Sequence, residues 1–207
     1  MMKPKIKKII EIDDAGWGDL IGGVFITVMR MDTYQQITGE IPLQFFQGDL
    51  FGMQAYLNEC TKVIWNAITN LGVNREEFEI HMCQGFVFTN AHEHLQEMGW
   101  MVKRRRISGT VQYMVENAYR EAVEALGFNY NLPIEQRMYE RKRRDGSKEL
   151  ISRGKFRFFR FIDWLKEDPE NRIQYVKTGF RSWSYWKYNV MSHAELRKKY
   201  KEMKNQD

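Results

Sequence analysis

Two adjacent carboxylates, Asp13 and Asp14, end a short apolar run near the beginning of the chain. The branched apolar residues predict a strand over residues 9–13, and the glycines of Ala15-Gly16-Trp17-Gly18 predict a turn after it. A carboxylate at a strand end points into the mouth of a sheet, where oxygen ligands can hold divalent cations. Two such ions about 3.5–4 Å apart can activate a water and stabilise the leaving oxygen of a phosphodiester. One aspartate cannot do this alone, and the same residues also suit a plain turn.

The spacing of apolar residues predicts the elements that position these carboxylates. Two further strands are predicted at residues 22–31 and 38–46, and their short connections indicate an antiparallel meander. Helical spacing extends over residues 50–71. There follow a strand at 78–83, a helix at 90–99, a strand at 100–107 and a helix at 111–126. Because a helix joins the last two strands, they should pair in parallel, which predicts an α/β fold with a mixed five-stranded sheet flanked by helices.

Beyond residue 130 the sequence changes to charged stretches interleaved with aromatic residues. We therefore expect a core over residues 1–130 and a basic, aromatic-rich, helical C-terminal extension over residues 131–207. In the extension, a helix is predicted at residues 155–165 and Pro169 marks a break. Ser192 is expected to cap a terminal helix at residues 194–203.

The composition narrows the class of protein. A hydrophobic content of 43% and an aromatic content of 14% exclude a chain too polar to fold. Cys60 and Cys83 have neither disulfide-framework nor zinc-ligand spacing, which indicates a reducing compartment. No apolar run approaches the ~20 residues of a membrane span. We expect a cytoplasmic protein with no membrane partner.

The formal net charge of +5 is concentrated in basic clusters. These clusters are Lys103–Arg106, Arg141–Arg144, Arg153–Arg160 and Arg197–Lys204. Clustered cations favour a polyanionic partner, because phosphates that they neutralise release condensed counterions. The alternative is that the clusters are solvated faces that only aid solubility.

The first-strand motif of the type 2 ribonucleases H resembles the segment Ile10-Glu11-Ile12-Asp13-Asp14-Ala15-Gly16-Trp17-Gly18-Asp19-Leu20-Ile21-Gly22-Gly23. In that family an acidic pair followed by Ala-Gly closes the strand. The resemblance implies that Asp13 is the leading metal-ligand aspartate and that Asp14 takes the place of the neighbouring glutamate. It also implies Mg²⁺ or Mn²⁺ as cofactor. Trp17 and Asp19 depart from the usual basic residue and proline. The predicted element order resembles the ribonuclease H-like superfamily over about the first 127 residues.

A weaker similarity, to Holliday-junction resolvases of the RuvC kind, falls on Met82-Cys83-Gln84-Gly85-Phe86. Those enzymes, and ribonucleases H in general, present another acidic ligand at this strand end. Here the position is occupied by Cys83, and a neutral thiol is a poor magnesium ligand because hard cations prefer oxygen. Glu79, the alternative, lies at the start of the strand, which is the poorer position.

The family resemblance further implies carboxylates carried by helices. Glu116, one position from the apolar residue Val115, is the candidate third catalytic residue beside Asp13 and Asp14. Glu59 is a candidate metal ligand by analogy with the family's helix-borne glutamate. Both residues also suit an ordinary solvated helix position.

Basic and aromatic residues predict the contacts to nucleic acid, since bases stack on aromatic rings and phosphates pair with cations. The candidate set is Lys103, Arg104, Arg105, Arg181, Trp183, Trp186 and Lys187. The alternative is that the aromatic residues pack the extension onto the core while Lys and Arg reach outward.

Three functions follow, in order of preference. The first is a nucleic-acid-processing protein acting as a metal-dependent nuclease on RNA, DNA or a hybrid. The second is a catalytically inactive ribonuclease H-like module that binds nucleic acid or acts as a scaffold, which Cys83 favours. A small-molecule enzyme ranks last, because the sequence contains no glycine-rich phosphate loop after a strand.

Overall fold

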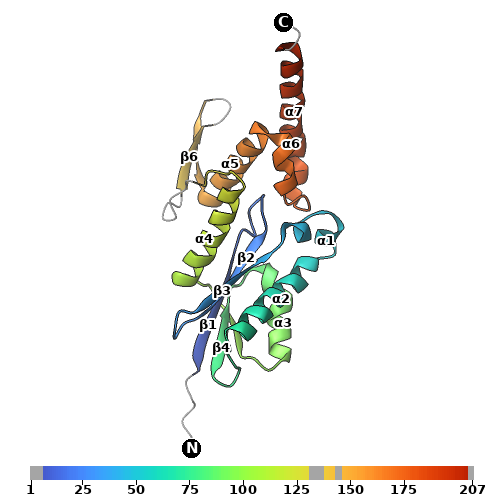
Figure 1. Ribbon diagram of the computed structural model, residues 1–207. Coiled ribbons are helices and arrows are strands. Elements are labelled where there is room, and N and C mark those ends of the chain that lie inside the picture. Colours follow the sequence, from blue (N-terminus) through green and yellow to red (C-terminus); the bar gives the residue numbers. More distant parts are fainter. Residues whose placement is uncertain (1–6, 131–137, 143–145, 205–207) are drawn as a thin grey trace, which may run out of the picture.

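The computed structural model describes residues 7–130, 138–142 and 146–204 of the chain. A mixed sheet carries helices on both faces, and the C-terminal helices extend from one end of the molecule (Figure 1). Residues 131–137, just after the expected domain boundary, lie outside the described residues, as do Arg143 and Arg144 of one basic cluster.

The five-stranded sheet has the order β3-β2-β1-β4-β5. Its strands are β1 (Lys8–Ala15), β2 (Val24–Arg30), β3 (Gln36–Ile41), β4 (Phe78–Met82) and β5 (Val102–Arg104). The pairs β1–β2 and β2–β3 are antiparallel, whereas β1–β4 and β4–β5 are parallel. This is the expected ribonuclease H-like arrangement, so the prediction of the fold class is confirmed.

Helices cover both faces of the sheet, and different residues of β1 contact them on each face. One face is covered by α2 (Ala55–Asn70) and α3 (Thr89–Glu97), which pack on Ile10 and Ile12 in the larger apolar core. On the other face α4 (Thr110–Ala125) packs against Ala15. Successive side chains of a strand alternate between faces. Asp13 therefore points toward the α4 side, and Asp14 toward the α2 side.

Two predicted boundaries in the core are wrong. The third strand ends at Ile41 rather than residue 46, since Pro42 has no N–H to donate, and Leu43–Phe46 forms a 3-10 turn. The helix predicted from residue 50 is divided into α1 (Gly48–Gly52) and α2, because Gln54 between them adopts a left-handed conformation with φ of 55°. A second 3-10 turn, Phe86–Phe88, precedes α3.

The extension begins with an antiparallel hairpin that no sequence pattern predicted. Its strands are β6 (Met138–Lys142) and β7 (Lys148–Ser152), and the helices α5 (Arg153–Glu167), α6 (Pro169–Arg172) and α7 (Arg181–Lys204) follow, with a 3-10 turn at Ile173–Tyr175. The predicted cap at Ser192 is wrong, because Ser192 lies inside α7 and donates to the carbonyl of Asn189. Across the described ranges, none of the helices combines the length and apolar character needed to cross a membrane.

The extension shares an apolar core with residues 1–130. Ile21 and Tyr119 from the first part pack in one cluster with Phe161, Leu165 and Trp183 from the second. The backbone N–H of Lys177 donates to the carbonyl of Leu20 at 2.8 Å, and that of Gly22 donates to Tyr175 at 2.9 Å. The extension is thus joined to the turn that follows β1, while the division into two domains stays a prediction.

Gly179→Ala tests this packing. A Cβ at Gly179 would lie 2.5–2.6 Å from three side-chain atoms of Phe51. Overpacking of a filled site costs about 1–3 kcal/mol, so we expect urea titration to give a free energy of unfolding lower by that amount. Gly154→Ala in α5 is the matched control, because nothing lies within 4 Å of its added methyl. Equal losses in both variants would contradict the close contact with Phe51.

Candidate metal centre

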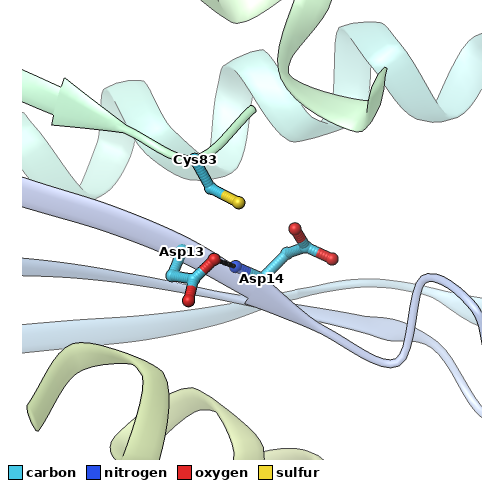
Figure 2. A group of neighbouring side chains, drawn as sticks. All are labelled: Asp13, Asp14 and Cys83. Carbon is cyan, nitrogen blue, oxygen red and sulfur yellow. Dashed lines mark hydrogen bonds between the residues drawn. The ribbon is translucent and has the colours of Figure 1, made fainter. Parts of the chain in front are cut away.

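The parallel pairing of β1 with β4 brings Asp13 next to Cys83. The N–H of Cys83 donates to the carbonyl of Ile12 at 2.9 Å, which continues the β1–β4 ladder beyond Met82. The Asp13 carboxylate accepts the N–H of Asp14 at 2.9 Å and the thiol of Cys83. One ligand atom from each of Asp13, Asp14 and Cys83 lies within 4.8 Å of the others (Figure 2).

Both carboxylates of this cluster are costly to ionise. Burial raises the pKa of Asp13, which is only 6% exposed, and the nearby charge of Glu116 raises it further. Burial and the charge of Asp13 raise the pKa of Asp14 to about 7. A bound divalent cation would stabilise both charged forms, because the ion is then the largest local charge.

The donor set only partly suits the metal that the fold implies. Carboxylate oxygens of Asp13 and Asp14 fit Mg²⁺ or Mn²⁺. Burial and the charge of Asp13 raise the pKa of the Cys83 thiol to about 12, so the sulfur stays protonated at neutral pH. A protonated thiol is not a ligand for a hard cation. The carboxylates would therefore hold the ion, and Cys83 stands beside them as a hydrogen-bond donor.

Glu116 reaches the same edge of the sheet from α4. Its charge acts on Asp13, and together with Asp14 it lines a cleft of about 250 Å³ beside the Gly16-Trp17-Gly18 turn. Its two carboxylate oxygens accept from Gln112 at 3.2 Å and from Arg153 at 3.3 Å. Glu116 thus shares a cleft with Asp14 and acts on the charge of Asp13, while the ligand cluster itself consists of Asp13, Asp14 and Cys83.

Glu59 lies outside the cluster of Asp13, Asp14 and Cys83. It forms an ion pair with Lys62 at 2.9 Å on α2. The α2 side chain that interacts with the charge of Asp14 is the neighbouring Cys60, which is fully buried. Neighbouring helix positions point about 100° apart, so the position toward the sheet is taken by the cysteine rather than by the glutamate.

The basic residues of β5 lie at the same edge and have partners in the core. Lys103 bonds Glu79 at 2.8 Å, and Arg105, just after the strand, bonds His81 at 2.9 Å. Arg104 donates to the carbonyl of Gly85 at 2.7 Å and so supports the loop that follows Cys83. Lys103 and Arg105 remain exposed.

The predicted aromatic contacts in the extension are used for packing. Trp183 is 4% exposed, and Trp186 lies against Phe158 and Phe159 with ring centroids 6.1 and 5.7 Å apart. Trp183 is therefore buried, whereas Trp186 is partly exposed. Arg181 and Lys187 are exposed.

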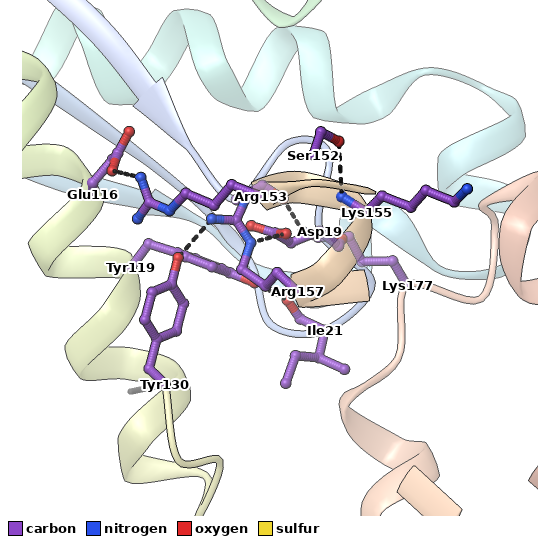
Figure 3. A network of polar contacts seen from close by, with 11 residues as sticks. Asp19, Ile21, Glu116, Tyr119, Tyr130, Ser152, Arg153, Lys155, Arg157 and Lys177 are labelled. Atoms are coloured by element: carbon purple, nitrogen blue, oxygen red, sulfur yellow. Dashed lines mark hydrogen bonds and ion pairs between the residues drawn. The ribbon is translucent and has the colours of Figure 1, made fainter. Parts of the chain in front are cut away.

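Sequence reasoning missed a buried polar network that holds the turn after β1. Lys177 is fully buried and its ammonium donates to the carbonyls of Gly16 and Asp19. Arg157 donates to the Asp19 carboxylate and to the Tyr130 hydroxyl (Figure 3). Burial lowers the pKa of Lys177 to about 7, an effect that the charge of Asp19 opposes. The residue that could have pointed to this network is Asp19, which stands where the type 2 motif usually has a proline.

Comparison with known proteins finds distant structural similarity only. No protein-family model matches the chain, and neither does any curated protein. Among solved structures, the catalytic core domain of BIV integrase is similar, with a TM-score of 0.32 and 16% sequence identity over 57% of this chain and 68% of that chain. A similarity this distant says nothing of the reaction, so the fold assignment depends on the strand order and the site on its own residues.

Asp14→Asn should stabilise the metal-free protein at neutral and alkaline pH. Since folding raises the pKa of Asp14 from 3.8 to about 7, the folded state holds a proton there that the unfolded chain has lost. Stability therefore falls as pH rises through this window. One pKa unit corresponds to about 1.4 kcal/mol, so the variant should gain at most about 4 kcal/mol above pH 7 and nothing below pH 4.

Urea unfolding in EDTA at several pH values measures this difference. Asp32→Asn is a control of opposite sign, because the hydrogen bond from Arg30 lowers the pKa of Asp32 and that carboxylate should stabilise the fold at neutral pH. Parallel pH profiles for wild type and Asp14→Asn would refute the assigned pKa.

Proposed function

We propose that this chain is a divalent-metal-dependent nuclease that cleaves phosphodiester bonds in nucleic acid. The observation that carries the proposal is the cluster of Asp13 and Asp14 at the carboxyl end of β1, beside a cleft that Asp14 and Glu116 line together and with the charge of Glu116 acting on Asp13. The pKa values of Asp13 and Asp14 are raised, and a divalent cation held between these carboxylates would stabilise their charged forms.

The three carboxylates would hold Mg²⁺ or Mn²⁺ through oxygen. When bound, such an ion lowers the pKa of a water and neutralises charge on the phosphate. Asp13 is fixed for this role by its bonds to the Asp14 N–H and the Cys83 thiol. The Glu116 carboxylate is held by hydrogen bonds from Gln112 at 3.2 Å and from Arg153 at 3.3 Å.

Residues around the cleft suit a nucleic-acid backbone. The turn at Gly16-Trp17-Gly18 lets a substrate approach the main chain closely, since Gly18 has no other atom within 4 Å of the place of a Cβ. Arg157 also lines the cleft, where it is paired with the Asp19 carboxylate. These features support RNA, DNA or a hybrid as substrate, and they do not separate the three.

A second candidate is a module that binds nucleic acid without cleaving it. Two observations favour it: the thiol of Cys83 stands where a carboxylate is expected, and Glu116 is paired with a cation of the chain itself, Arg153, at 3.3 Å. The activity assay below separates the two candidates.

Asp13→Asn and Glu116→Gln should each abolish cleavage. The loss of several kcal/mol of transition-state stabilisation corresponds to about 1,000-fold or more in rate. Labelled RNA, RNA–DNA hybrid, duplex DNA and junction substrates are incubated with each protein in Mn²⁺ and Mg²⁺. Glu121→Gln, an exposed glutamate on the same helix, is the matched control and should cleave like wild type. Absence of cleavage in wild type would favour the binding module, and equal cleavage by wild type and Asp13→Asn would reject the assigned role.

Cys83→Asp should lower the Mg²⁺ concentration needed for half-maximal activity several-fold. The change replaces a protonated thiol by an oxygen donor next to Asp13, and hard cations prefer oxygen. Cys60→Ala removes the other cysteine, which lies outside the cluster of Asp13, Asp14 and Cys83, and is the control. A Mg²⁺ titration identical for wild type and Cys83→Asp would show that position 83 does not face the ion.

A further inference from the structure

The net positive charge of the chain is carried by α7. By sequence, residues 181–204 contain seven Lys or Arg and two Asp or Glu, which leaves 25 basic and 25 acidic residues in the rest of the chain. The formal charge of this one helix therefore equals the +5 of the whole protein. Figure 1 shows α7 leading away from the sheet at the end of the molecule where the C-terminus lies.

The first half of α7 has two different faces. Trp183, Trp186 and Val190 recur at helical spacing and pack toward the body of the protein. Tyr185 and Tyr188 are three positions apart, so they share the opposite face, where they are 82% and 83% exposed. Arg181 is exposed on the same face, four positions before Tyr185. Large aromatic side chains are usually at least half-buried. Two neighbouring exposed tyrosine rings with Arg181 on the same helix face are therefore unusual.

The start of α7 lies close to the candidate metal centre through aromatic contacts. Phe180, immediately before α7, has its ring centroid 6.0 Å from that of Trp17. Trp17 lines the cleft that also contains Asp14 and Glu116.

We propose that the outward face of α7, formed by Arg181, Tyr185 and Tyr188, binds single-stranded nucleic acid. The tyrosine rings stack on unpaired bases, and Arg181 pairs with a phosphate. A duplex offers no base faces to such rings, so the unpaired strand is the preferred ligand. A second copy of the chain is a poorer occupant, because it would bring two strongly basic helices together. The inference rests on the proposed function, whose substrate it narrows to strands with an unpaired segment.

Binding is measured by fluorescence anisotropy with a labelled single-stranded oligonucleotide and the matching duplex, in EDTA so that no cleavage occurs. Tyr185→Ala and Tyr188→Ala should each weaken binding to the single strand about tenfold. Binding to the duplex should change little. Arg181→Gln should reduce the slope of log affinity against log salt by about 0.7.

Tyr34→Asn is the matched control. Tyr34 is another exposed tyrosine, at 63%, but it lies in the turn between β2 and β3 next to the amino end of β1. Its φ of 59° is one that asparagine tolerates. This variant should bind both ligands like wild type.

Unchanged single-strand binding in the tyrosine variants, or an equal loss on duplex, would overturn the proposal. So would light scattering that shows a wild-type dimer converted to a monomer by the tyrosine changes, because α7 would then be covered by a second copy. The nuclease proposal is tested separately, because Asp13→Asn should bind the single strand normally in EDTA while losing cleavage. Tyrosine-dependent binding by a wild type that cleaves nothing would reject the nuclease and retain this surface.

Discussion

The register between β1 and β4 is the constraint on which the site depends. The backbone bond from Cys83 to Ile12 sets residue 83 beside Asp13, and a slip of one residue would turn the side chains of β4 to the opposite face of the sheet. The register is specified because Ile12 and Met82 are both fully buried in the same core. Burial of apolar residues on one face therefore determines which polar residues meet at the strand ends.

The turn after β1 needs support from outside the core, because it gathers carboxylates in a partly buried place. Lys177 and Arg157 of the extension supply that support by bonding the turn's carbonyls and the Asp19 carboxylate. A buried ammonium is expensive unless its donors are satisfied. Here two carbonyl oxygens accept from it, and the rings of Phe46 and Phe180 lie 5.3 and 5.6 Å from it. The extension is consequently part of the site's architecture.

Local patterns in the sequence predicted the sheet, most of its helices and the Asp13–Asp14 pair, because hydrophobic periodicity is a local property. The Lys177 and Arg157 contacts span 158–161 and 138 positions, and no local pattern encodes pairs so far apart. The aromatic run in α7 was misjudged for another reason. With the helix start placed at residue 194, its phase was unknown, so the sequence could not tell that Trp183 turns inward while Tyr185 turns outward.

Cys83 can be understood as a balance between two demands on the same cluster. A fourth carboxylate beside Asp13, Asp14 and Glu116 would increase like-charge repulsion and raise the pKa values of its neighbours further. A protonated thiol adds no charge, and its hydrogen bond to Asp13 lowers the pKa of that aspartate. The cysteine therefore stabilises the ionised form of the central carboxylate in the absence of metal, whereas a carboxylate would favour the bound ion. Position 83 thus sets how much like charge collects at this edge of the sheet.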